Sequence, residues 1–82
     1  QNMAMEFKLE RILEIKGTKN KNNCNRYMRT DLQVLVRWEG YDESYDSWEP
    51  YKEVKDTQVF KEYCLQNNLK YLIPNRYLTE ED

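Results

Sequence analysis

Residues 33–38 carry the pattern that most restricts the fold of this chain. The segment reads Gln-Val-Leu-Val-Arg-Trp, and a short run rich in β-branched residues that ends on an aromatic is typical of a β-strand. Gly40 and the polar residues 42–44 follow as a turn. Residues 45–49 then alternate aromatic with polar side chains, which predicts another strand. Pro50 ends it, because proline has no N–H to donate to a neighbouring strand.

A further strand is expected at residues 7–15. Four apolar residues there fall on alternate positions: Phe7, Leu9, Leu13 and Ile15. This two-residue period indicates a strand with one exposed face. Arg11 interrupts the pattern, so we expect a bulge near Arg11 and Ile12. A helix is the competing interpretation, since Leu, Glu and Lys favour helices, but the β-branched and aromatic residues favour a strand.

Residues 56–67 form the clearest helical pattern. Asp56 or Thr57 can cap its first turn, and the apolar stripe consists of Val59, Phe60, Tyr63 and Cys64. We expect the helix to end at Asn67-Asn68 and the apolar residues 69–73 to pack back on the sheet. The fold class is therefore α+β: a three-stranded antiparallel curved sheet, or small partial barrel, with a C-terminal helix packed against it.

Residues 16–31 are polar and turn-rich, and they carry basic side chains with no acidic residue before Asp31. We interpret the segment as a long, solvated loop, with part of a strand around Tyr27 and Met28. A flexible connection is one interpretation. A nucleic-acid contact is the other, with the candidate residues Lys19, Lys21, Arg26 and Arg29.

Composition excludes several classes of function. A length of 82 residues fits one small domain. The chain has no His and only two Cys, Cys24 and Cys64, so we expect no metal site, no cofactor and no enzyme. Two free thiols in a reducing compartment are expected, with a disulfide as the alternative. The chain lacks a run of 18 apolar residues, so we expect no membrane partner. Because it begins with Gln1, we expect that it is a piece of a longer protein.

Five aromatic residues fall within residues 38–51 and alternate with acidic ones: Trp38, Tyr41, Tyr45, Trp48 and Tyr51. A cluster of electron-rich ring faces can hold a cation, with an attraction of about 0.5–1 kcal/mol at exposed sites and roughly 2 kcal/mol when desolvated. A methylated ammonium suits such a cage, because an ordinary lysine would lose its water without gaining acceptors. The alternative is that these rings belong to the core or sit half exposed.

The segments Val36-Arg37-Trp38-Glu39-Gly40-Tyr41 and Ser47-Trp48-Glu49-Pro50 resemble the signature of chromodomains, and the match extends over residues 6–66. The resemblance implies a module that binds methylated lysine on histone tails through an aromatic cage, here Phe7, Trp38 and Tyr41. It places Trp48 in the core. It also implies that the tail is clamped as an added strand between residues 5–9 and 49–54, with the candidate contacts Glu6, Leu9, Glu49 and Glu53.

The sequence departs from the family pattern at three points. Tyr45 stands where heterochromatin-type members often carry Glu, and it is either an extra cage wall or solvent-exposed. Glu53 replaces a common Asn, and residues 16–31 exceed the usual loop length. The stretch from Glu49 to Pro74 resembles chromodomains at the C-terminus of Ty3/gypsy-type retrotransposon integrases, which implies a targeting module whose cage is often degenerate. We expect residues 6–74 to form the domain, with flexible ends at 1–5 and 75–82.

Three functions follow from these observations. The first is a methyl-lysine reader of the histone-three tail, acting in the nucleus as a monomer. The second is a nucleic-acid binder that uses the basic loop, and the third is a protein–protein module with a collapsed cage. The net charge of −2 hides an asymmetry: residues 1–37 hold 8 basic and 4 acidic residues, and residues 38–82 hold 5 and 11. The acidic part surrounds the expected cage and suits a basic tail.

Overall fold

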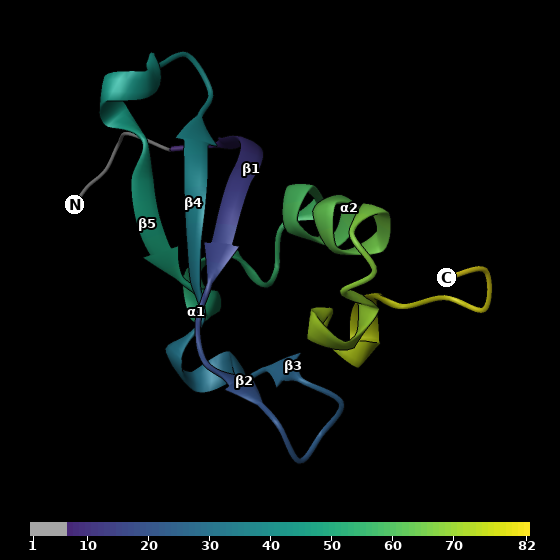
Figure 1. The fold of residues 1–82 in the computed structure, drawn as a ribbon. Helices are drawn as coiled ribbons and strands as arrows, with labels where there is room; N and C mark the ends of the chain where they lie inside the picture. The colour runs from purple at the N-terminus through teal and green to yellow at the C-terminus, as the bar shows by residue number, and fades with distance from the viewer. Residues whose placement is uncertain (1–6) are drawn as a thin grey trace.

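The computed structural model describes residues 7–82; residues 1–6, including the expected flexible end 1–5, lie outside the described part. Strands β1 (Leu9–Lys16), β4 (Gln33–Trp38) and β5 (Ser47–Pro50) form an antiparallel sheet in the order β1-β4-β5. Helix α2 (Gln58–Gln66) packs beside β1 (Figure 1). The predicted α+β class, with three antiparallel strands and a C-terminal helix, is confirmed.

Two register shifts interrupt the pairing of β1 with β4. Leu9 lies opposite Trp38, Ile12 opposite Val36, and the shifts fall between Leu9 and Arg11 and between Ile12 and Glu14. The expected bulge is therefore present. The shift has a consequence that the sequence did not predict. It turns the Ile12 side chain toward the interior, where the residue is 8% exposed.

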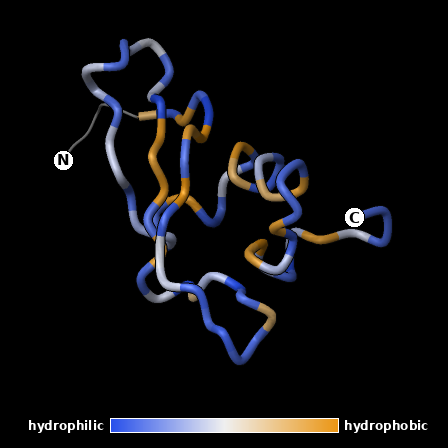
Figure 2. Tube along the Cα trace, viewed as in Figure 1, coloured by the Kyte–Doolittle hydropathy of each residue, from blue (hydrophilic) through white to orange (hydrophobic). Residues whose placement is uncertain are grey.

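The core lies between the inner face of the sheet, α2 and the segment that follows α2. Figure 2 shows hydrophobic stretches along β1, β4 and α2 and in that later segment. The buried apolar residues are Ile12, Leu32, Val34, Val36, Tyr51, Val54, Phe60, Cys64, Leu72 and Ile73.

Trp48 does not belong to this core. It pairs with Leu35, and paired residues of antiparallel strands point to the same face. Val34 and Val36, the neighbours of Leu35, are fully buried on the other face. Trp48 therefore lies on the outer face, where the Lys16 Nζ stands 4.1 Å from its ring centroid. The placement of Trp48 in the core was wrong, because the strand register turns its side chain outward.

The segment between β1 and β4 is more ordered than predicted. Strands β2 (Lys19–Asn20) and β3 (Arg26–Tyr27) form a hairpin, and a 3-10 helix follows at Arg29–Asp31. The Tyr27 N–H donates to the Tyr71 hydroxyl at 2.9 Å, and Tyr27 packs against the core. The predicted strand near Tyr27 is confirmed. Residues 16–31 are solvent-exposed as expected, apart from the half-buried Tyr27, but they contain this hairpin and helix in place of an irregular loop.

Helix α2 begins as the sequence indicates. The Thr57 Oγ1 accepts a hydrogen bond from the Phe60 N–H at 3.1 Å, which identifies Thr57 as the N-cap. The helix ends at Gln66, next to the expected Asn stop. A short helix, α1 (Tyr51–Val54), precedes it and was not predicted.

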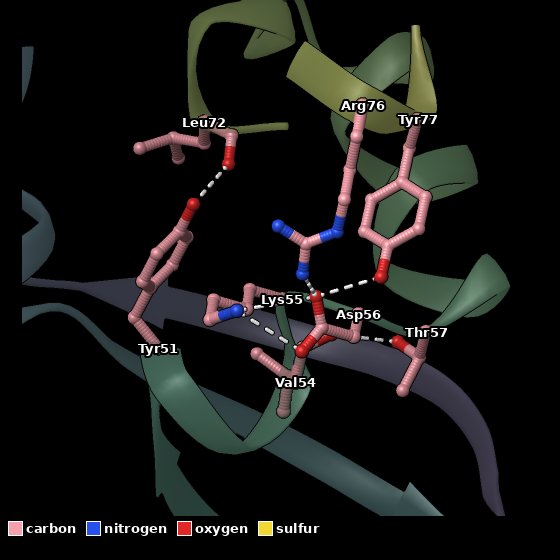
Figure 3. A network of polar contacts seen from close by, with 8 residues as sticks. All are labelled: Tyr51, Val54, Lys55, Asp56, Thr57, Leu72, Arg76 and Tyr77. Atoms are coloured by element: carbon pink, nitrogen blue, oxygen red, sulfur yellow. Dashed lines mark hydrogen bonds and ion pairs between the residues drawn. The ribbon is translucent and has the colours of Figure 1, made fainter. Parts of the chain in front are cut away.

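The segment after α2 is held by polar contacts (Figure 3). The Tyr51 hydroxyl donates to the Leu72 carbonyl at 2.7 Å. The Asp56 carboxylate accepts from the Arg76 guanidinium at 2.5 Å, from the Tyr77 hydroxyl at 2.9 Å and from Lys55 at 3.0 Å. Within the range 75–82, expected to be a flexible end, Asn75–Tyr77 form a 3-10 helix and Asp82 pairs with Lys61 at 2.9 Å.

Within residues 7–82, no helix is long and apolar enough to cross a membrane.

Replacement of Asp56 by Asn is expected to weaken the dependence of stability on acid pH. Hydrogen bonds from Lys55 and then Tyr77 hold the pKa of Asp56 below its usual value. A lowered folded-state pKa contributes stability above the unfolded-state pKa of about 3.9, and this contribution is lost as the pH falls through the folded-state value. Urea unfolding across this range should show a shallower acid decline for Asp56→Asn.

The exposed Glu80→Gln substitution removes an equal charge from the C-terminal end and serves as the control. If Asp56→Asn and the natural chain lost stability in parallel as the pH fell, the hydrogen bonds of the Asp56 carboxylate would not contribute to the acid dependence of stability.

Candidate functional site

Four aromatic rings from three segments line one pocket of about 270 Å³. Phe7 precedes β1, Trp38 ends β4, and Tyr41 and Tyr45 lie in the β4–β5 connection. The Phe7 ring centroid lies 5.7 Å from those of Trp38 and Tyr41, and the ring planes are inclined at 68° and 39°. The rings are therefore tilted around a space rather than stacked flat.

The Trp38 indole is fixed by its position on the inner face of the sheet. Trp38 follows Val34 and Val36 at two-residue spacing, so its ring points to the same face. The indole Nε1–H donates to Ser47 Oγ at 2.9 Å, and the Ser47 hydroxyl donates to Glu49 Oε2 at 2.7 Å. This chain of hydrogen bonds sets the plane of the ring and occupies one carboxylate oxygen of Glu49.

A glycine turn brings Tyr41 back toward Trp38. The Tyr41 N–H donates to the Trp38 carbonyl at 3.1 Å, which closes a four-residue turn. Gly40, its third residue, has φ +84°, the left-handed value that a type II turn requires at this position. A side chain at Gly40 would meet open space, so the constraint is the backbone angle and not the available volume.

The rest of the connection is braced by an ion pair. Arg37 Nε and Nη2 lie 2.5 and 2.8 Å from the two carboxylate oxygens of Asp46, and the two side chains are only 18% and 15% exposed. The carboxylate raises the pKa of Arg37, and the guanidinium lowers the pKa of Asp46. Between them, Asp42 caps the 3-10 helix Glu43–Tyr45.

Tyr45 lines the aromatic pocket from its outer rim. Its side chain is 60% exposed, and its ring centroid lies 5.0 Å from that of Tyr41 at an interplanar angle of 61°. Tyr45 thus lines the pocket and is also exposed to solvent, and its role as an extra cage wall stays a prediction.

A groove of about 400 Å³ adjoins the aromatic pocket and shares Phe7, Trp38 and Glu49 with it. Three of the four expected peptide contacts, Leu9, Glu49 and Glu53, line this groove. The fourth, Glu6, lies outside the described residues. Lys8 and Val54 also line the groove and fall within the expected clamp ranges 5–9 and 49–54. Thr57 and Val59, at the start of α2, complete the lining, and only the three-dimensional packing could identify these two.

Three of the four candidate nucleic-acid residues, Lys19, Lys21 and Arg26, lie on the β2–β3 hairpin, and Arg29 begins the 3-10 helix that follows it. The hairpin and the β4–β5 connection lie at opposite ends of the sheet (Figure 1). Lys19 and Arg26 line a separate pocket, and Lys21 is exposed on the hairpin turn. Arg29 is exposed as well, but its guanidinium donates to the Tyr71 carbonyl at 2.6 Å and lies 5.5 Å from the Tyr51 ring centroid.

Neither cysteine contributes to a site of metal or disulfide chemistry within the described range. Cys24 is exposed, Cys64 is buried, and both are free thiols. Among residues 7–82, no group of three His, Cys, Asp or Glu side chains could hold a metal ion. Burial raises the pKa of the Cys64 thiol to about 12, so this thiol stays protonated at neutral pH.

Comparison with known proteins agrees with this architecture. The model of the Chromo (CHRromatin Organisation MOdifier) domain family matches residues 7–64. This chain belongs to the chromodomain family, whose members are binding modules generally associated with chromatin.

Three relatives illustrate where such domains occur. A protein named "Putative DNA (cytosine-5)-methyltransferase CMT1" from Arabidopsis thaliana is 36% identical over 75 residues, covering 84% of this chain. The DNA (cytosine-5)-methyltransferase CMT1 of Oryza sativa subsp. japonica is 33% identical over 83% of the chain, and the human testis-specific chromodomain protein Y 1 is 40% identical over 57%. The matches cover 8%, 6% and 7% of these proteins, respectively.

No solved structure matches the chain with comparable significance. The relatives named above do not test the expected integrase origin, which stays a prediction.

Replacement of Asp46 by Asn is expected to loosen the β4–β5 connection. Arg37 would lose its ion pair, and the turn held by the Tyr45 N–H to Asp42 and Asp46 N–H to Glu43 bonds would open more often. Amide hydrogen exchange over residues 42–46 should become faster, while exchange in β1 stays slow.

Glu43→Gln is the matched control, since it removes the same charge from an exposed position of the same turn. Equal exchange rates in both variants would contradict a bracing role for the Arg37–Asp46 pair.

Proposed function

We propose that this domain reads a methylated lysine on a basic peptide tail. The observation that carries the proposal is the set of inclined rings of Phe7, Trp38 and Tyr41 around one pocket. A methylated ammonium that entered the pocket would contact several ring faces at once, and each contact within about 6 Å of a ring centroid is attractive.

The chemistry of the pocket wall favours a methylated over an unmethylated lysine. An unmodified ammonium has three N–H donors that must find acceptors when they leave water. The wall offers aromatic carbon, and one carboxylate oxygen of Glu49 at its edge already accepts from Ser47. A trimethylammonium has no N–H to satisfy, so it loses little by entering and gains the attraction of the rings.

The adjoining groove accounts for binding of the peptide on either side of the lysine. Glu49 and Glu53 line the groove opposite Lys8 and Leu9, and this acidic lining suits a basic tail. An extended peptide laid between residues 7–9 and 49–54 would add a strand beside the sheet, the mode in which backbone hydrogen bonds supply affinity.

The proposed ligand is the N-terminal tail of histone three, with its lysine nine as the first residue to test. The proposed role is to bring a longer nuclear protein to chromatin that carries this mark. The parent protein is proposed to be an enzyme that acts on chromatin, such as a retroelement integrase.

Peptide titration tests the proposal directly. A trimethylated tail peptide is expected to bind about 30-fold more tightly than the unmethylated peptide, the ratio that corresponds to about 2 kcal/mol of desolvated cation–π attraction. Trp38→Ala should remove this preference, as measured by calorimetry.

Trp48→Ala is the matched control, because Trp48 lies on the outer face of the same sheet. Equal affinities for the two peptides, or an equal loss of preference in the two Trp variants, would contradict the proposed site.

Tyr45→Ala is expected to weaken the trimethylated peptide about 2- to 5-fold, the value of an exposed cation–π contact of 0.5–1 kcal/mol. The unmethylated peptide should bind as before, and Tyr45→Phe, which keeps the ring, should change neither affinity. An unchanged affinity of Tyr45→Ala for the trimethylated peptide would limit the site to the other three rings.

A further inference from the structure

A second pocket of about 410 Å³ lies between the β2–β3 hairpin and residues 68–71, which follow α2. Three basic residues line it: Lys19, Arg26 and Lys70. The remaining lining residues are neutral, namely Cys24, Asn25, Tyr27, Asn68, Leu69 and Tyr71. The described wall therefore concentrates positive charge without a carboxylate to balance it.

Two of these cations rest on aromatic faces and not on acidic partners. Lys19 Nζ lies 4.9 Å from the Tyr27 ring centroid, and Arg26 Cζ lies 4.7 Å from that of Tyr71. A cation on a ring face is positioned but keeps its full charge. Arg37, by contrast, has its charge matched by Asp46. The rings thus hold the Lys19 and Arg26 cations in place, and both charges remain available to a ligand.

Lys70 contributes a third charge with donors to spare. Its Nζ donates to the backbone carbonyl of Asp82, and an ammonium has three donors. The Asp82 carboxylate is itself engaged by Lys61 at 2.9 Å. The Lys70 charge is therefore not neutralised by a side-chain partner in this contact.

The two walls of the pocket are tied to each other. The Tyr27 N–H donates to the Tyr71 hydroxyl at 2.9 Å, and Arg29 donates to the Tyr71 carbonyl at 2.6 Å. These bonds connect segments more than 40 residues apart in sequence, and Lys19, Arg26 and Lys70 line the pocket between the two segments. Arg29 makes one of these bonds but does not line the pocket.

We propose that this pocket binds the phosphodiester backbone of a nucleic acid at a site separate from the peptide groove, through Lys19, Arg26 and Lys70. Lys21, exposed on the hairpin turn, extends the positive charge beyond the pocket, which suits a chain of phosphates better than a single ion. The β2–β3 hairpin, which lines the pocket, and the β4–β5 connection, which bears Tyr41 and Tyr45, lie at opposite ends of the sheet (Figure 1), so both ligands fit at once.

Binding of a labelled duplex DNA, followed by fluorescence anisotropy at several salt concentrations, tests this site. With about three phosphates neutralised, the logarithm of affinity should fall with that of salt at a slope of about −2.7, or about 40-fold between 50 and 200 mM. Lys19→Gln/Arg26→Gln should leave about one contact and reduce that fall to about 4-fold. A duplex RNA of the same length serves as the second arm, because it shares the backbone chemistry.

Two further variants separate the site from general charge effects. Arg11→Gln/Lys16→Gln removes one Arg and one Lys from exposed positions outside the pocket and should keep the salt slope. Lys19→Arg/Arg26→Lys keeps both charges and should also keep it. All variants should bind the methylated peptide with unchanged affinity, which distinguishes failure of this proposal from failure of the peptide site.

The exposed Cys24 thiol gives a readout that needs no substitution. Cys24 lines the pocket and Cys64 is buried, so iodoacetamide should alkylate Cys24 alone in the folded protein. Duplex DNA should slow this alkylation, and the methylated tail peptide should not. The proposal is overturned if neither duplex binds in low salt, if the two double Gln variants weaken binding equally, or if bound duplex leaves Cys24 fully reactive.

Discussion

The interrupted pairing of β1 with β4 is the constraint on which the candidate site depends. In a regular strand, Leu9 and Ile12 would point to opposite faces, because their spacing is odd. The register shift between them places Leu9 opposite Trp38 and Ile12 opposite Val36, so both face inward. The same strand therefore contributes Ile12 to the core and Leu9 to the groove, and the residue before it, Lys8, accepts a backbone hydrogen bond from Glu39 at 2.8 Å. Phe7 is carried to the pocket by this pairing.

The acidic and basic residues of the chain lie on different parts of the fold. The acidic residues Glu49 and Glu53 line the groove that also reaches Trp38, and the basic hairpin leaves the sheet where β1 ends at Lys16. Balanced overall charge thus conceals two surfaces of opposite sign. The C-terminal segment supports the basic surface, because Tyr71 joins the hairpin to the segment after α2.

Local pattern predicted the parts of the fold that local forces determine. The strand at residues 33–38, the Thr57 cap and the Asn stop of α2 all follow from side-chain type and spacing. The short helix α1 was missed because four residues give no helical period. Trp48 was misplaced because its face depends on strand register, and the docking of the hairpin was missed because Tyr27 and Tyr71 lie 44 positions apart.

In the candidate site, too, some features could be predicted from local sequence and others depend on how distant segments pack. Alternating aromatic and acidic residues indicated a cation site, but the choice of Phe7 came from the family resemblance, since Phe7 is distant in sequence from Trp38. Ser47, which orients the Trp38 indole, could be found only once the register of β4 with β5 was known.

The central claim is that the methylated ammonium of a peptide lies among Phe7, Trp38 and Tyr41. Intermolecular nuclear Overhauser effects from the N-methyl protons of a bound trimethyllysine peptide measure this most directly. The account predicts contacts from these protons to the ring protons of all three residues. Contacts to other residues instead, with the peptide bound, would contradict it.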